Sequence, residues 1–125
     1  MILDTNALSA WAEGNSTCRP AFLEATGLTV PVIVLGEYLY GIRQSRYRDR
    51  YETWLNQNLP FTKIQPVTDQ TANEYADLRI YLKKKGTPMP ANDVWIAALA
   101  LELNFPVLSN DAHFDLVPNL LRLNF

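Results

Sequence analysis

The sequence contains a single cysteine, Cys18, so it can form no internal disulfide. A chain without disulfides suits a reducing compartment, and we expect a cytoplasmic protein. The longest apolar-rich segment, residues 93–105, is interrupted by Asp93, Glu102 and Asn104 and is too short to span a bilayer. The N-terminus also lacks the basic and apolar regions of a signal peptide. These absences predict a protein without a membrane segment.

Neither sign of charge predominates. Eleven Lys and Arg residues stand against 13 Asp and Glu residues, which gives a formal net charge of −2. This balance excludes strong nonspecific nucleic-acid binding through bulk charge, but it leaves room for local basic patches. Repeats are absent, and glycine and proline do not gather into a linker. A length of 125 residues with 48% hydrophobic side chains therefore predicts one domain, residues 1–125, with a substantial core.

Short apolar segments alternate with segments of helical periodicity. The alternation predicts an α/β fold with a central, mainly parallel sheet and helices on both faces. The segment VIVLGEYLYGI fits a helix or a strand, and we predict a helix that ends near Gly41. We expect Thr5 or Asn6 to cap the first helix. The predicted strands cover residues 1–3, 28–30, 62–67, 106–109 and 120–125, and the predicted helices cover residues 7–13, 17–26, 32–43, 46–59, 70–85 and 92–103.

Four acidic residues stand out because they adjoin apolar segments. Asp4 directly follows the first predicted strand, and Asp111 follows the strand PVLS. Glu37 lies inside the apolar segment VIVLGEYLYGI, and Asp93 begins the apolar segment DVWIAALALEL. Parallel strands end at the same edge of a sheet, and ligands gather at that edge. We therefore expect the four carboxylates to share one cleft.

Four carboxylates in one cleft repel each other, and protons or cations must neutralise them. Oxygen ligands without an accompanying His/Cys cluster select Mg²⁺ or Mn²⁺ over zinc. Such ions orient phosphates and activate water for attack. The set of four acids therefore favours metal-dependent hydrolysis of a phosphodiester.

Taken singly, each acid also fits a structural role. Asp4 and Asp111 can cap the helices that follow them. Asp93 can favour the positive end of its helix, and Glu37 can be exposed on a strand or loop. Glu102 also lies among apolar residues, yet it is near a helix end where it can reach water. The interpretation as a metal site depends on the four acids as a set.

The sequence resembles the PIN-domain family, and in particular VapC-type toxins of bacterial toxin–antitoxin pairs. Four segments carry the resemblance in order: MILDTNALSAW, PVIVLGEYLYGI, GTPMPANDVWIAALALELNFPVLSND and SNDAHF. They resemble an Asp-Thr-Asn after strand one, a Glu in an apolar segment, an Asn-Asp pair opening an alanine-rich helix, and a Ser/Thr-x-Asp before a Phe. The match spans residues 1 to about 114, and the order and spacing make it specific.

The resemblance implies a PIN-like three-layer sandwich and a Mg²⁺- or Mn²⁺-dependent endoribonuclease that cleaves RNA with a metal-activated water. Asp4, Glu37, Asp93 and Asp111 would form the catalytic metal site. Supporting polar roles would fall to Asn6, Ser109 and Asn92. Asn92 also fits a helix cap. His113 is not required by the family pattern, and we expect a surface histidine there.

Two basic stretches are candidates for RNA binding beside the acids. The first, RQSRYRDR, contains Arg43, Arg46 and Arg48, and the second, KKKG, contains Lys84. Both also fit a solvated helix face. The resemblance further implies a small antitoxin partner and a homodimer. Four residues are candidates for an exposed apolar interface, although they also fit the core: Tyr38, Tyr40, Trp54 and Leu55.

Two other functions remain open from the sequence. A PIN nuclease can act on another nucleic acid, such as DNA or a maturing RNA. Alternatively, the acids are structural caps and the protein is a non-catalytic subunit of a DNA-binding complex. The sequence does not name the RNA that would be cut.

Overall fold

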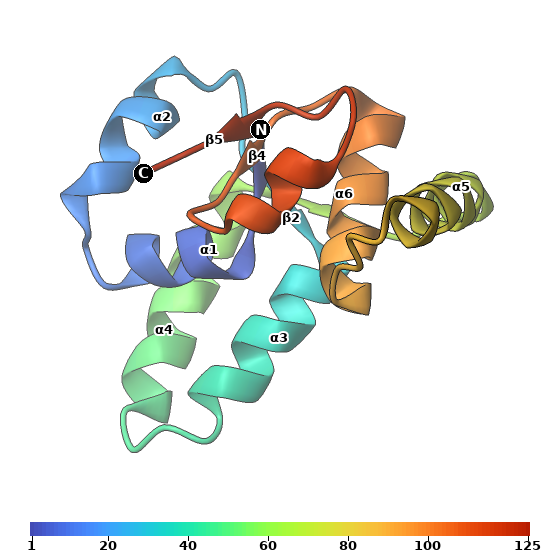
Figure 1. Cartoon of the computed structure of the whole chain (residues 1–125). Coiled ribbons are helices and arrows are strands. Elements are labelled where there is room, and N and C mark those ends of the chain that lie inside the picture. Colours follow the sequence, from blue (N-terminus) through green and yellow to red (C-terminus); the bar gives the residue numbers. More distant parts are fainter.

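A five-stranded parallel sheet runs through the centre of the molecule (Figure 1). The computed structural model describes all residues from Met1 to Phe125. The spatial order of the strands is β3-β2-β1-β4-β5, and every neighbouring pair is parallel. The strands are β1 (Ile2–Leu3), β2 (Thr29–Pro31), β3 (Lys63–Gln65), β4 (Val107–Leu108) and β5 (Arg122–Leu123). The predicted parallel sheet is confirmed, although its strands are only two or three residues long.

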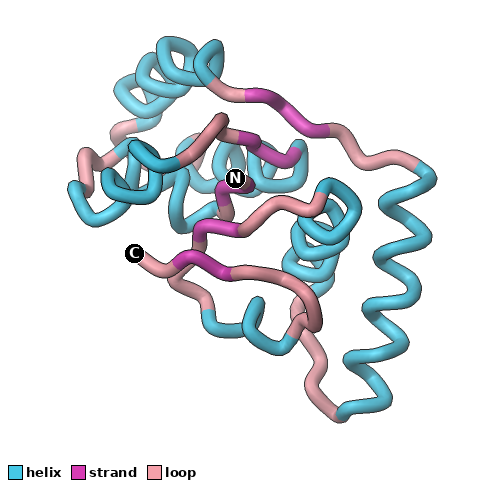
Figure 2. Tube along the Cα trace, turned by 90° about the horizontal axis from the view of Figure 1, so that it is seen from above, coloured by secondary structure: helices cyan, strands magenta, loops and turns pink.

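Helices flank the sheet on both sides (Figure 2). The helices are α1 (Thr5–Ala12), α2 (Arg19–Glu24), α3 (Val32–Ile42), α4 (Arg48–Asn58), α5 (Asp69–Lys85) and α6 (Ala91–Leu103), with 3-10 turns η1 (Ser16–Cys18), η2 (Leu59–Phe61) and η3 (Ala112–Leu116). The chain runs along the sheet from β1 through β2 to β3, and it then returns from β3 to β4. Because the crossovers are right-handed, α1 to α4 lie on one face of the sheet, and α5 and α6 lie on the other. The predicted three-layer α/β sandwich is confirmed.

The first two helices differ from the prediction at their ends. Helix α1 begins at Thr5, because Asp4 is its N-cap and accepts a hydrogen bond from the Thr5 backbone N–H at 2.8 Å. Thr5 and Asn6 therefore lie inside the first turn and do not cap it. The predicted helix over residues 17–26 divides into η1 and α2, and Pro20 falls in the first turn of α2, where proline is tolerated.

Helix α3 confirms the choice of helix over strand for residues 32–43, and Gly41 lies in its last turn. The predicted apolar interface is partly wrong. Tyr38 and Leu55 are core residues, with exposed fractions of 4% and 3%. Tyr40 is 73% exposed, and Trp54 is half-buried against the core. The sequence could not make this distinction, because which apolar residues of α3 and α4 are covered depends on how the two helices pack.

The core surrounds β1, which lies at the middle of the sheet. Ile2, Leu3 and Val107 are fully buried, as are Phe114 of η3 and Ile96 of α6. Burial on both faces explains why β1 and β4 consist of apolar residues without alternation. No helix is long and apolar enough to cross a membrane.

Candidate active site

The central strands bring the first and last of the four acids, Asp4 and Asp111, to one edge of the sheet. β1 pairs with β4 in register, with Leu3 opposite Leu108. Asp4 follows Leu3 directly, and Asp111 comes three residues after Leu108. Because parallel strands end at the same edge, both carboxylates emerge at the carboxyl end of the sheet. The placement expected from the sequence is therefore observed.

Two helices add the other acids. Glu37 lies in the middle of α3, where its Oε1 accepts a hydrogen bond from Thr5 Oγ1 at 3.0 Å. Asp93 lies in the first turn of α6 and accepts no hydrogen bond from the protein. The negative charges of Asp4, Asp111 and Glu37 each raise the pKa of Asp93 by electrostatic repulsion. The structure thus brings the four acids within electrostatic reach of one another, and it places ligand atoms of Asp93 and Asp111 within 4.8 Å.

Asp4 is the most deeply placed of these acids, with an exposed fraction of 4%. Its Oδ2 accepts hydrogen bonds from Ser109 Oγ at 2.7 Å and from Asn6 Nδ2 at 2.9 Å. Asn6 Nδ2 also lies 3.1 Å from Ser109 Oγ. Ser109 Oγ in turn accepts a hydrogen bond from the Asp111 backbone N–H at 3.0 Å. Asn6 and Ser109 therefore fix the orientation of Asp4 and link it to the loop that carries Asp111.

Asn92 does not cap α6, which was the alternative to its supporting role at the site. The N-cap is Pro90, and Asn92 is an exposed residue of the first turn. Its side chain lines a shallow hollow on the outer face of α3 together with Glu37 and Tyr40. Asn92 therefore lies beside the acids but makes no hydrogen bond with them.

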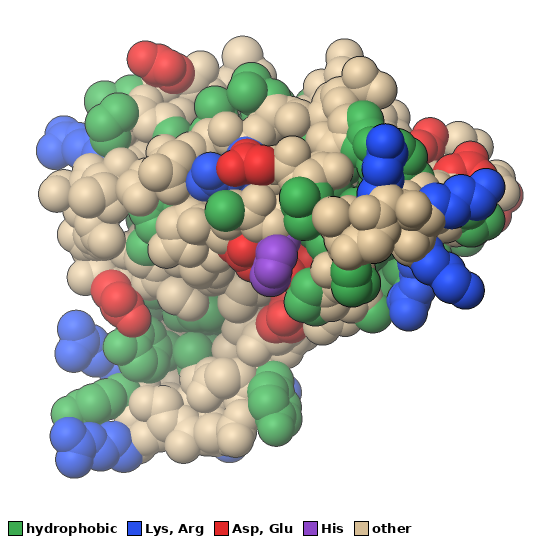
Figure 3. All heavy atoms as spheres, viewed as in Figure 1, with side chains coloured by type: hydrophobic (Ala, Val, Ile, Leu, Met, Phe, Trp, Pro, Cys, Tyr) green, Lys and Arg blue, Asp and Glu red, His purple; other side chains and the backbone are tan.

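His113 is exposed, as expected of a surface histidine, but it also lies against Asp111. Its Nδ1 lies 3.1 Å from Asp111 Oδ1, and its backbone N–H donates to the same oxygen at 2.9 Å. Ligand atoms of Asp93, Asp111 and His113 all lie within 4.8 Å of one another. Figure 3 shows the histidine in the middle of one face with acidic side chains beside it. The only sequence signal was its position two residues after Asp111.

Two of the acids have raised pKa values. Burial is the main cause for Asp93, and repulsion from Asp4, Asp111 and Glu37 adds to it, so its pKa rises to about 6. Burial also raises the pKa of Asp4, although the hydrogen bonds from Ser109 and Thr5 oppose the rise. Burial is thus the first cause of both shifts, repulsion among the acids adds to it, and His113 opposes the rise in the pKa of Asp93.

No Lys or Arg side chain forms an ion pair with the four acids, although Arg122 donates to the backbone carbonyl of Ser109 at 3.1 Å. The ion pairs of Arg43 and Arg48 go to Glu52, and that of Arg122 goes to Asp115. The donor set is thus made mostly of carboxylate oxygens from four separate elements, as Mg²⁺ and Mn²⁺ prefer. The residues present fit a divalent cation. His113 could be an additional nitrogen ligand, or it could orient the Asp111 carboxylate through the contact at Nδ1.

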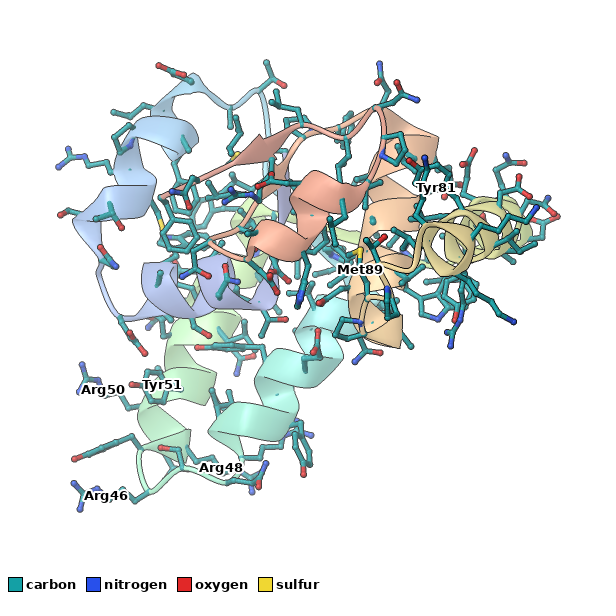
Figure 4. The ribbon with its side chains drawn as sticks, viewed as in Figure 1. Arg46, Arg48, Arg50, Tyr51, Tyr81 and Met89 are labelled. Atoms are coloured by element: carbon teal, nitrogen blue, oxygen red, sulfur yellow. The ribbon has the colours of Figure 1, made fainter.

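The arginines expected to bind RNA lie away from the acids. Figure 4 shows Arg46 and Arg48 at the far tip of the hairpin formed by α3 and α4. Arg43 and Arg48 both bind the Glu52 carboxylate, at 2.9 and 3.0 Å. Lys84 is exposed near the end of α5. The structure therefore does not bring the first basic stretch to the acidic site.

The comparisons with known proteins agree with this geometry. The PIN domain family model matches residues 1–120. Ribonuclease VapC5 of Mycobacterium tuberculosis is 29% identical over 115 residues, covering 90% of this chain and 84% of that protein. Ribonuclease VapC2 of Rickettsia felis is 28% identical over 99 residues, covering 78% of this chain and 74% of that protein.

Solved structures share the fold along nearly the whole chain. VapBC2 from Rickettsia felis, bound to a promoter DNA fragment, gives a TM-score of 0.87 at 24% identity, covering 99% of this chain and 97% of that chain. DNA-bound VapBC from Salmonella typhimurium gives a TM-score of 0.88 at 22% identity, covering 98% of this chain and 96% of that chain. The resemblance to VapC-type proteins drawn from the four motifs is confirmed, and the chain belongs to the PIN-domain family.

Proposed function

We propose that the protein is a Mg²⁺- or Mn²⁺-dependent endoribonuclease and the toxin of a toxin–antitoxin pair. The observation that carries the proposal is the convergence of Asp4, Glu37, Asp93 and Asp111 at the carboxyl end of the sheet without a Lys or Arg partner. The ribonuclease names of two relatives that cover most of this chain support RNA as the substrate.

Each residue of the site has a defined task in this proposal. Asp93, Asp111 and Glu37 present carboxylate oxygens to the cation. The buried carboxylate of Asp4 adds a fourth negative charge to the site. Asn6 and Ser109 hold Asp4 in one orientation by donating to its Oδ2. A bound divalent cation would polarise the scissile phosphate and activate water. Hydrolysis by an activated water requires no nucleophilic side chain. The single cysteine, Cys18, is buried in the core and is not part of the site.

The partners follow from the same proposal. The two solved structures described above are both VapBC complexes bound to DNA. We propose a small antitoxin as the partner of this chain and a homodimer as its assembly. Co-expression with the small reading frame next to the gene tests the pairing: a complex that survives size-exclusion chromatography supports it, and a chain that elutes alone contradicts it.

RNA cleavage by the purified protein tests the function. We expect cleavage of single-stranded RNA in Mg²⁺ or Mn²⁺, none in EDTA, and none by Asp93→Asn, whose circular dichroism spectrum should match that of the wild type. The matched control is Asp77→Asn, an exposed helical carboxylate of α5 that leaves the site intact. Equal cleavage by wild type and Asp93→Asn would reveal a contaminating nuclease, and cleavage of DNA alone would identify a different nuclease.

A further inference from the structure

A cavity of about 250 Å³ lies between the end of α5 and the start of α6. Three of its lining side chains form an apolar floor: Leu82, Met89 and Val94 are at most 9% exposed. Two cations stand at its rim, Arg79 and Lys83. The six lining residues are Arg79, Leu82, Lys83, Pro88, Met89 and Val94.

This cavity adjoins the acidic site. Val94 lines the cavity and follows Asp93 in the first turn of α6, so their Cα atoms are about 3.8 Å apart. Figure 4 shows Met89 in front of α6, between η3 and α5. η3 carries His113, which lies against Asp111. A strand that leaves the acidic site toward α5 therefore passes over the cavity.

The two rim cations have no acidic partner. Arg79 and Lys83 are four residues apart and lie on the same face of α5. Neither forms an ion pair, because the arginine and lysine ion pairs of the protein involve only Arg43, Arg48 and Arg122. Figure 3 shows basic side chains gathered around α5. The rim thus carries two unpaired positive charges beside the acidic site.

Arg79 is held in place by aromatic residues. Its Nη1 donates to the Tyr75 hydroxyl, and its guanidinium lies 5.6 Å from the centre of the Tyr75 ring. Tyr75 in turn stacks on Trp95 with ring centres 3.9 Å apart and planes 14° apart. An arginine positioned in this way loses little freedom on binding an anion, and it retains further N–H groups for phosphate oxygens.

We infer that this cavity binds one nucleotide of the substrate strand next to the scissile phosphodiester, with the phosphate on Arg79 and Lys83 and the nucleoside over Leu82, Met89 and Val94. The inference rests on the proposed ribonuclease function. Positive charge at this position offsets the repulsion between an RNA backbone and the acidic site. The contacts are to the backbone and an apolar floor, so they favour single strands without selecting a sequence.

Binding of a fluorescein-labelled oligoribonucleotide in the Asp93→Asn background measures the contact. We expect the double variant Arg79→Met/Lys83→Met to bind about tenfold more weakly, since charge-assisted hydrogen bonds are lost. The slope of log affinity against log salt should fall by about 0.7 for each phosphate contact removed. Lys63→Met, which removes one exposed charge from β3, is the matched control and should change neither quantity.

Cleavage of a dinucleotide and of a longer oligoribonucleotide distinguishes nucleotide binding in the cavity from the proposed ribonuclease function. The cavity variants should cut an oligoribonucleotide more slowly than the wild type but cut a dinucleotide, which lacks the flanking phosphate, at the same rate. Wild-type protein that cuts neither RNA would refute the proposed function. Wild-type cleavage with unchanged binding and rates in Lys83→Met and the double variant would overturn the inference alone, and would assign the rim to an acidic protein partner instead.

Discussion

At the scale of single residues, structural and functional explanations of an acid are compatible. Asp4 caps α1 through Oδ1 and binds Ser109 and Asn6 through Oδ2. Asp111 caps η3 through Oδ1, which leaves Oδ2 without a hydrogen bond from the protein. The sequence presented capping and metal binding as alternatives. The structure uses one oxygen for the cap, so that the helix start holds the carboxylate at the site.

Asp93 gives a stability prediction with a definite sign. Its pKa rises from 3.8 to about 6 on folding, so the folded state binds more protons than the unfolded state between these values. Its contribution to the free energy of unfolding is therefore largest at low pH and is lost as pH rises through 6. In EDTA, we expect Asp93→Asn to melt at a higher temperature than the wild type at pH 7.5.

The melting-temperature difference between the two proteins should shrink toward pH 5, because the wild-type carboxyl becomes protonated and resembles the amide. Differential scanning calorimetry across this range measures it. Asp77→Asn, whose carboxylate is exposed on α5, should show no such dependence on pH. A variant that is less stable than the wild type at every pH would mean that Asp93 stabilises the fold and is not repelled by its neighbours.

At the scale of elements, glycine is favoured at the end of one helix and unfavourable in the interior of another. Gly86 ends α5 in the left-handed region with φ of 69°, and its backbone N–H bonds the carbonyl groups of Leu82 and Lys83. Gly36 lies within α3, and a Cβ at either glycine would meet no atom within 4 Å. Backbone conformation alone therefore distinguishes the two positions.

We expect Gly86→Ala to lower the free energy of unfolding by about 1 kcal/mol, because alanine is strained at positive φ. Gly36→Ala should raise it by up to about 1 kcal/mol through helix propensity. Urea unfolding monitored by circular dichroism measures both changes. Equal effects of the two substitutions, in either direction, would contradict the assignment of Gly86 as the left-handed cap.

At the scale of the whole molecule, the sequence predicts what is local or periodic. Alternating apolar strands and helices indicate the sheet, and the helix predicted over residues 70–85 is observed as α5, between Thr68 and Gly86. The acids can be placed because Asp4 and Asp111 directly follow strands. His113 could not be assigned to the site, because its contact with Asp93 depends on how η3 packs against α6. The cavity rim at Arg79 was missed for the same reason.

The distribution of charge over the molecule has the same origin. The net charge of −2 conceals four acids gathered at one edge of the sheet and unpaired cations on α5. Arg43 and Arg48, which the sequence favoured for RNA, instead bind Glu52 at the distant hairpin. The Arg43–Glu52 pair joins the end of α3 to α4 and is a tertiary contact that a basic run in the sequence does not reveal, whereas Arg48 and Glu52 form an i,i+4 pair within α4.

Binding of Mn²⁺ tests most directly that a divalent cation balances the acids. Isothermal titration of Mn²⁺ into metal-free protein at pH 7.5 should show saturable binding to the wild type and to Asp77→Asn. Asp93→Asn should lose most of this affinity, since one carboxylate of the cluster is gone. Equal affinity in all three proteins, or no measurable binding to the wild type, would contradict the account of this site as a metal centre.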